Sequence, residues 1–144
     1  MAEIKIIRGS TSTLLSTELN SLANNTGSAL GTEVNNSTAL EIYADFELLV
    51  TFGTNPTDGS LVELYIAGAL DGTNYEDGSS TVQLRTHYVG GFPVRAVTSA
   101  QRIPLRRIPI PPCKYKAYVV NKTGQTTASS GNTVKAFPYH FQSA

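Results

Sequence analysis

Two histidines are the side chains of this sequence best suited to acid–base or metal chemistry near neutral pH. His87 and His140 are the only histidines in the chain. A catalytic triad or a metal site would need one of them beside a Ser, Cys, Asp or Glu side chain. Neither histidine stands in a recognised motif, so we interpret both as strand or terminal surface residues. The sequence therefore predicts no enzyme, no catalytic residue and no cofactor.

The segment from Asp71 to Asp77 carries the carboxylates and carbonyls that calcium prefers as ligands. An EF-hand loop would place Asp or Asn at its third position and Glu at its twelfth. This chain has Thr73 and Val82 at those positions. We therefore interpret the segment as a polar hairpin loop and predict no metal site.

The densest basic cluster consists of Arg102, Arg106 and Arg107. Four prolines lie between positions 104 and 112, and the alternation of apolar residues changes parity at Arg106 and Arg107. This pattern predicts an edge strand or an extended crossover that contains a bulge. The arginines then have two interpretations, protection of the edge against unwanted strand pairing and contact with an acidic partner surface. The same residues can serve both purposes.

The element that best defines the fold is a strict alternation from Leu40 to Phe52. Every even-numbered residue there is apolar and most odd-numbered residues are polar. A period of two predicts one long β-strand with a single face against a core. Such a strand needs a sheet around it and a second layer to cover that sheet.

Shorter segments of strand-like composition follow along the chain. We predict strands over 3–8, 62–70, 81–88, 92–97, 113–120 and 133–139, with Gly90 and Gly91 separating two of them. The turn-rich segment 53–59 predicts a hairpin that pairs the strand 40–52 with the strand 62–70. Because no helices alternate with these strands, the sequence predicts an all-β fold, an antiparallel, jelly-roll-like β-sandwich.

One amphipathic helix is predicted over residues 13–24. Its apolar residues include Leu14, Leu15, Leu19 and Leu22 at helical spacing. Such a helix covers an edge or end of the sandwich, or it forms an arm that packs on a neighbouring subunit. We therefore divide the chain into residues 1–36, the N-terminal strand and helix that act as arm or cover, and residues 37–144, the β-sandwich of a single overall domain.

Composition excludes several classes of protein. The 144 residues are 40% hydrophobic, which suits one domain with one core. Eleven basic and eleven acidic residues give a net charge of zero, so we expect no direct nucleic-acid partner. The single cysteine, Cys113, cannot form an intramolecular disulfide. No segment has the length and hydropathy of a bilayer span or a secretory leader, which predicts synthesis in the cytoplasm and no membrane partner.

Three stretches, taken in order, resemble a known family. They are Ala-Leu-Asp-Gly-Thr-Asn-Tyr at 69–75 with Asp-Gly-Ser at 77–79, the segment Arg-Ile-Pro-Ile-Pro-Pro at 107–112 continuing to Tyr115 and Lys116, and Asn-Lys-Thr-Gly-Gln at 121–125 with Ser-Gly-Asn-Thr-Val-Lys at 130–135. They resemble small virion structural proteins of tailed bacteriophages, most of all jelly-roll cement or decoration proteins of capsids. The resemblance covers roughly residues 40–139.

The resemblance implies a structural protein on the capsid exterior, made in the host cytoplasm, whose partner is the major capsid protein. It also implies a homo-oligomer on the shell. Binding only to the assembled, expanded shell would stabilise that shell by mass action. The candidates for partner contact, by strand addition or by docking in a groove, are Arg102, Arg106, Arg107, Leu14, Leu15, Leu19 and Leu22.

Two alternatives remain open. The chain is otherwise a tail or baseplate accessory protein of the same virion, with tail proteins as partners, or a carbohydrate-binding β-sandwich module. Low copy number and attachment to tails would identify the first. Sugar affinity and a groove lined by tyrosines would identify the second.

Overall fold

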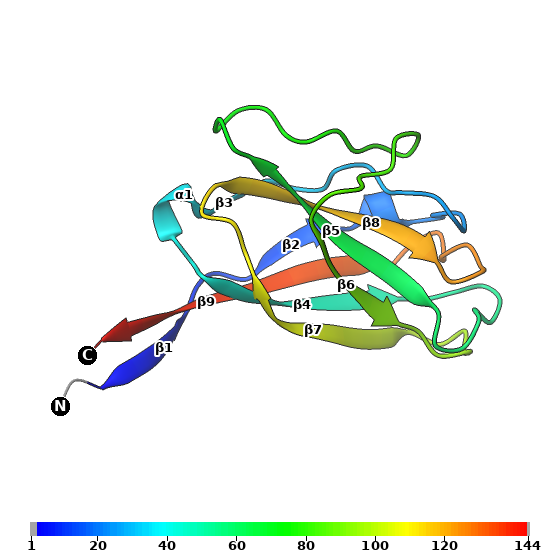
Figure 1. The fold of residues 1–144 in the computed structure, drawn as a ribbon. Helices are drawn as coiled ribbons and strands as arrows, with labels where there is room; N and C mark the ends of the chain where they lie inside the picture. The colour runs from blue at the N-terminus through cyan, green and yellow to red at the C-terminus, as the bar shows by residue number, and fades with distance from the viewer. Residues whose placement is uncertain (1–2, 144) are drawn as a thin grey trace.

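The protein is described by a computed structural model over residues 3–143, and its strands form two antiparallel sheets that pack face to face (Figure 1). Sheet A has the order β1-β9-β4-β7, with β2 also paired to β9, and sheet B has the order β3-β8-β5-β6. The strands are β1 (Ile4–Arg8), β2 (Ser12–Leu15), β3 (Val34–Asn35), β4 (Tyr43–Val50), β5 (Leu61–Ala69), β6 (Tyr88–Pro93), β7 (Gln101–Pro109), β8 (Lys114–Lys122) and β9 (Thr133–Ser143). The predicted all-β antiparallel sandwich is confirmed.

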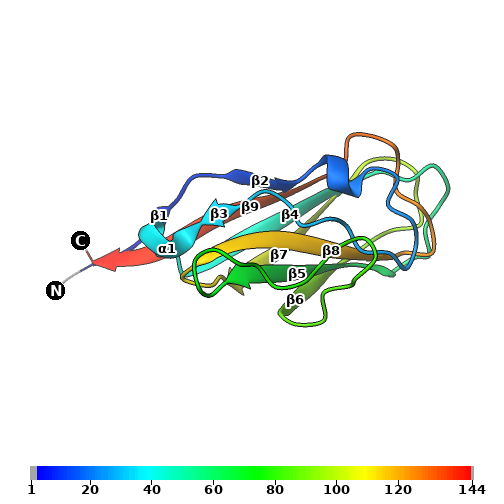
Figure 2. The same ribbon diagram turned by 90° about the horizontal axis from the view of Figure 1, so that it is seen from above.

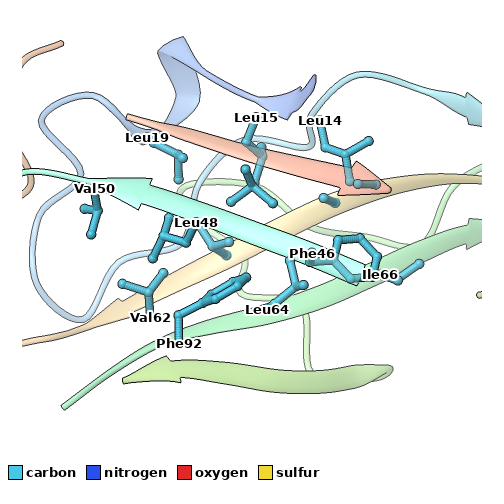
Figure 3. Close-up of a cluster of buried hydrophobic side chains, with 14 of the residues drawn as sticks. Leu14, Leu15, Leu19, Phe46, Leu48, Val50, Val62, Leu64, Ile66 and Phe92 are labelled. Atoms are coloured by element: carbon cyan, nitrogen blue, oxygen red, sulfur yellow. The ribbon is translucent and has the colours of Figure 1, made fainter. Parts of the chain in front are cut away.

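The main core lies between the sheets. Strand β4 buries its even-numbered residues, as the alternation predicted, and Phe46 and Leu48 are fully buried. Strand β5 meets it from the other sheet with Val62 and Leu64 (Figure 3). Each large side chain buried in this way contributes about 1.5–3 kcal/mol to folding. The core therefore fixes the relative position of the two sheets.

The hairpin predicted at residues 53–59 is wrong. Strand β4 pairs with β7 and β9, whereas β5 pairs with β6 and β8 in the other sheet. Residues 51–60 thus cross from one sheet to the other. The physical reason is that strands with one apolar face satisfy that pattern equally well when they pack face to face in a sandwich as when they pair edge to edge.

The helix predicted over residues 13–24 is also wrong. The segment forms β2 and a 3-10 turn, η1 (Thr17–Leu19). A register shift between Thr13 and Leu15 places an extra residue in β2, and both Leu14 and Leu15 are buried. Leu19 and Leu22 are buried in the same cluster. A bulged strand followed by a tight turn therefore buries leucines at the same spacing along the sequence as an amphipathic helix would.

The long strand begins later than predicted. A short helix, α1 (Asn36–Ala39), precedes Leu40, which has a φ of 51° as the residue that ends this helix. Leu40 and Ile42 are exposed, not buried. The two shorter strands predicted over 81–88 and 92–97 are replaced by β6, which contains Gly90 and Gly91 in its interior.

The two sheets differ in what covers their outer faces. Outside sheet B, Leu84 from the connection between β5 and β6 packs with Tyr118 and Val120 in a second apolar cluster. The hydroxyl of Tyr118 donates to the carbonyl of Ser79 at 3.0 Å. This connection lies over sheet B in Figure 1. The outer face of sheet A keeps aromatic side chains of β4 and β9 partly exposed.

Candidate interaction surfaces

The first and last strands form a ribbon that projects from one end of the sandwich, as Figure 2 shows from above. Strand β1 pairs antiparallel with the end of β9, from Ile4 opposite Ser143 to Arg8 opposite Tyr139. Among the named strands, β1 pairs with β9 alone. The other edge of β1 is therefore open. We call residues 4–8 and 139–143 the terminal arm.

The terminal arm exposes large apolar side chains. Ile4 and Ile6 are 76% and 63% exposed, and Phe141 is 42% exposed. Ile6 stands opposite Phe141 in the register. Monomeric soluble proteins rarely expose contiguous apolar surface of this kind without a binding role. The arm is thus the first candidate interaction surface.

Three aromatic rings continue the apolar surface from the arm onto sheet A. The ring of Tyr43 stacks on that of Tyr139 with centroids 5.7 Å apart, and Phe141 packs edge-on against both at 6.1 and 6.3 Å. We call Tyr43, Tyr139 and Phe141 the aromatic patch. The patch arises because odd-numbered residues of β4 and β9 point away from the core while their even-numbered neighbours are buried.

Sequence reasoning did not single out this patch. Phe137, Tyr139 and Phe141 alternate with Ala136, Pro138 and His140, which is the period-two signal of a strand. The predicted strand ended at residue 139, so the aromatic row was cut short. The pairing of β1 with β9 is a contact between the two chain ends, which no local pattern reveals.

The three predicted arginines all lie on β7, which is an edge strand of sheet A as predicted. The predicted bulge is confirmed, because the β4–β7 register shifts between Ala44 and Phe46. Arg107 sits in this bulge with a φ of 55°, and its backbone N–H donates to Asp45 Oδ1 at 2.8 Å. Arg102 forms an ion pair with Glu47 at 2.7 Å. Arg106 is exposed.

A shallow hollow of about 200 Å³ joins the terminal arm to the β7 bulge. It is lined by Ile6, Arg8, Asp45, Arg107, Phe137, Tyr139 and Phe141. Of the predicted arginines, Arg107 therefore lies with the arm, while Arg102 stands opposite Leu49, far along β7. The four predicted leucines do not join this surface. Their side chains lie in the chain's own core, so they are not exposed to meet a partner.

Each histidine lies beside one glutamate. At the base of the arm, His140 Nδ1 is 2.7 Å from Glu41 Oε2, whose side chain is 9% exposed. On the surface, His87 Nδ1 is 3.0 Å from Glu76 Oε2. Within residues 3–143, no group of three or more His, Cys, Asp and Glu side chains is arranged to hold a metal ion.

A second cavity, of about 390 Å³ and with a mixed polar and apolar lining, lies next to the arm base. Its lining includes Glu41, Asn36 and Tyr115. Asn36 is fully engaged, since its amide donates to the carbonyls of Glu41 and Pro111 and its oxygen accepts from the Glu41 N–H. Tyr115 is buried, and its hydroxyl has no hydrogen-bond partner among the described residues. Burial, followed by the charge of Glu41, raises the pKa of Tyr115 to about 12.

The acidic loop is organised around one carboxylate. Asp71 accepts hydrogen bonds from the backbone N–H groups of Thr73 and Asn74, at 2.8 and 2.7 Å, and from the side-chain amide of Asn74 at 2.7 Å. The bonds from Asn74, together with that from Thr73, lower the pKa of Asp71 to about 2. The Asp71 carboxylate thus holds its own loop as an Asx-turn does.

An apolar groove of about 550 Å³ opens between the ends of β5, β6 and β7. Its lining includes Ile66, Leu70, Tyr88, Val89, Ile108 and Ile110. Leu70 is 83% exposed there. This groove lies between the free edges of the two sheets, since β6 and β7 end the strand orders of sheets B and A.

Comparisons of this chain with family models, with curated proteins and with solved structures found no match. No helix in the described part of the chain is long and apolar enough to cross a membrane. The fold and surfaces define the class, an antiparallel β-sandwich with an exposed terminal arm.

Proposed function

We propose that this protein is a structural component of a tailed-bacteriophage virion that binds the assembled capsid shell as a cement or decoration protein. The resemblance of residues 40–139 to such proteins supports the virion assignment. The observation that supports a binding role is the terminal arm, which exposes Ile4, Ile6 and Phe141 beside an open strand edge. Apolar side chains exposed in this way are suited to docking in a groove of a partner.

The partner is the major capsid protein, and binding works by mass action. A protein that binds the expanded shell but not its separate subunits stabilises the shell by a free energy that grows with the logarithm of one plus the ratio of its free concentration to its dissociation constant. Two surfaces are available for this contact. The arm offers apolar side chains, and the β7 edge offers Arg106 and Arg107. Both lie at borders of sheet A.

The deciding experiment is quantitative mass spectrometry of gradient-purified particles. The number of copies of this chain per major shell protein is compared between full virions and tail-less heads. A high ratio that is retained on tail-less heads is the expected result. A low ratio that falls with loss of the tail would make the chain a tail or baseplate accessory protein. Absence from both kinds of particle would overturn the virion proposal.

A second experiment assigns the surface. Shells stripped of this protein are re-decorated with purified chain that carries Ile4→Asp, and with Arg106→Glu as a variant of the other edge. If the arm binds the shell, Ile4→Asp lowers occupancy and Arg106→Glu leaves it unchanged. Val82→Asp is the matched control, because Val82 is also an exposed apolar residue but lies on the connection over sheet B. Equal occupancy for all variants would remove both surfaces from the proposal.

Carbohydrate binding is the second candidate, and one observation favours it. Tyr139 and Phe141 of the aromatic patch line the shallow hollow of sheet A together with Asp45, Arg8 and Arg107, and Tyr43 stacks on Tyr139. Aromatic rings with nearby charged hydrogen-bonding groups are suited to sugars. Titration of oligosaccharides against the chain and against Tyr139→Ala tests this candidate. No binding, or equal binding to both, would remove it.

A further inference from the structure

The sheet edges differ in how they are protected against pairing with another strand. Strand β7 contains Pro104 and the Arg107 bulge, which interrupt its free edge. Strand β6 ends at Pro93 and has a register shift against β5. Strand β3 is only two residues long. The edge at β2 is covered, because the carbonyl of Leu14 accepts from the N–H of Thr32 at 2.7 Å.

Strand β1 has none of these four features, and its charged residues are Lys5 and Arg8. It runs through Ile4–Arg8 without proline, glycine or a register shift, and all five residues are exposed. Proteins that remain monomeric usually blunt an exposed, flat, apolar edge strand. The β1 edge is therefore suited to pairing with a further strand.

The hydrogen-bonding direction of β1 follows from its contact with β9. The N–H of Gly9 donates to the carbonyl of Pro138 at 2.9 Å, in line with the register of β1 and β9. Because alternate residues of an antiparallel strand bond to the same neighbour, Lys5 and Ile7 also point their backbone groups toward β9. The N–H and C=O groups of Ile4, Ile6 and Arg8 then point to the open edge.

We propose that two copies of this chain associate through their β1 edges, antiparallel and about a two-fold axis at Ile6. In this register Ile6 faces Ile6 of the second copy, and Ile4 faces Arg8. Three residue pairs form, and each exchanges two backbone hydrogen bonds. A register displaced by two residues loses one of these pairs, and a register centred between Ile4 and Ile6 also places Lys5 opposite Lys5. The proposal does not depend on the proposed function.

The side chains of β1 are self-complementary in this register. Since Ile6 stands opposite Phe141 within one chain, the outer face of the joined sheet carries the row Phe141, Ile6, Ile6, Phe141. Lys5 faces Ile7 on the other face, and Glu3 lies 3.8 Å from Lys5 in the same chain. No two like charges stand directly opposite. The net charge of zero means that two copies do not repel one another at long range.

A second copy is therefore the occupant that this edge fits. The pairing is isologous, since the same strand serves in both molecules, and it closes after two subunits. The interface is one pair of five-residue strands with their flanking side chains. That is smaller than the roughly 1,600 Å² of a standard interface. We therefore expect a weak dimer in solution. Where many copies are anchored on one surface, their high local concentration would strengthen the pairing.

The test is sedimentation equilibrium of the full chain from about 10 µM to about 1 mM, the range in which weak dimers dissociate. The expected apparent mass rises from 15.4 kDa toward twice that value. Ile6→Glu places two carboxylates opposite each other and should raise the dissociation constant of the dimer at least about tenfold. Ile4→Glu is the matched control, because the same substitution on the same face would lie opposite Arg8 and should leave dimerisation intact or stronger.

A mixing experiment gives a positive readout. Ile6→Glu and Ile6→Lys should each be monomeric alone and should dimerise when mixed, because opposite charges then meet across the two-fold axis. Ile4 and Ile6 are both exposed, so all of these variants are expected to fold. Circular dichroism verifies this. A wild-type chain that is monomeric at every concentration overturns the proposal. It is also overturned by dimerisation that Ile6→Glu does not weaken, or by equal effects of the two glutamates. Monomers whose β1 edge binds a strand of a shell protein would assign the edge to that partner instead.

Discussion

The carboxylate of Asp45 on β4 accepts a hydrogen bond from the backbone N–H of Arg107 at 2.8 Å, at the bulge in β7 where the register of the two strands shifts. Arg107 has a φ of 55°, in the left-handed region that costs a residue with a side chain about 1–2 kcal/mol. The hydrogen bond offsets part of this cost. The extra residue of a bulge has no partner strand residue for its backbone N–H, and here the charged Asp45 carboxylate accepts from that N–H instead. The bulge is thus a specified feature of the edge.

We expect opposite effects from substitutions at the two ends of this contact. Arg107→Gly removes the left-handed strain and should raise the free energy of unfolding by about 1 kcal/mol. Asp45→Ala leaves the Arg107 N–H without its acceptor and should lower it by about 1–2 kcal/mol, whereas Asp45→Asn retains an acceptor and should cost less. Urea titration measures all three. A loss of stability in Arg107→Gly would show that the arginine side chain itself holds the edge.

Two buried tyrosines differ in what their hydroxyls contact, and their phenylalanine variants should differ accordingly. The Tyr115 hydroxyl has no partner among the described residues, while that of Tyr118 donates to Ser79. Tyr115→Phe should therefore be neutral or stabilise the fold, because it removes a buried polar group whose burial costs about 1–3 kcal/mol. Tyr118→Phe should lower stability by about 0.5–1.5 kcal/mol. Thermal and urea unfolding compare the pair, and equal losses would contradict this account.

The raised pKa of Tyr115 has a consequence at alkaline pH. Its pKa is about 12 in the folded chain against a reference value of 10.0, so folding favours the neutral phenol. The stabilisation is complete below pH 10 and is lost as the pH rises toward 12, because the unfolded chain releases this proton first. Tyr115→Phe should therefore flatten the fall of unfolding free energy over this range. The pKa values of Tyr65 and Tyr75 are also raised to about 12, so a reduced slope remains. An unchanged slope would contradict the assignment.

Asp71 should dominate the acid behaviour of its loop. Its pKa is lowered to about 2 from 3.8 by bonds from Asn74 and Thr73. Because the folded chain favours the carboxylate, this contribution is present above about pH 4 and is lost as the pH falls through about 2. Carboxyl carbon NMR should give a midpoint near 2 in the wild type. Asn74→Ala removes one of the three donors, the side-chain amide, since residue 74 keeps its backbone N–H, and it should move the midpoint part of the way back toward 3.8. A midpoint still near 2 would assign the effect to the backbone N–H groups alone.

The features of this fold that were predictable from sequence are those that depend on the residues of a single strand, such as which of its faces is buried. The alternation of Phe46 and Leu48 correctly predicted a strand with one buried face, and the parity change at Arg107 correctly predicted a bulged edge. Partner choice was not predictable, because alternation does not tell whether a strand pairs with its neighbour or packs across the core from it. The adjacent Leu14 and Leu15 were assigned to a helix for a similar reason, since a bulge also buries two consecutive residues.

The surfaces were less accessible to sequence reasoning than the fold. The edge position of the three arginines was predictable, because prolines and a parity change are local signals, whereas the leucines proposed beside them as contact residues lie in the core. The terminal arm joins residues 4–8 to residues 139–143. Pairing between the two chain ends depends on the finished sandwich, which brings β9 through the middle of sheet A and leaves its last residues without another neighbour.

The junction between arm and sandwich depends on the small size of Gly9. A Cβ at this position would press against Glu41 Oε1 and would lie 3.2 Å from Pro138 Cγ. Gly9→Ala should therefore displace the Glu41 carboxylate from His140 and lower the free energy of unfolding by about 1 kcal/mol, the low end of the range for overpacking, because the nearest atom is the end of a side chain that can move. Replacing Glu41 by Ser in the same chain removes the obstruction, so the double variant should lose less than the sum of the single losses. Urea unfolding gives the coupling, and hydrogen exchange of the β1 amides reports whether the arm detaches. Strictly additive losses would mean that Gly9 and Glu41 act independently, and the close approach at the arm base would then have no energetic role.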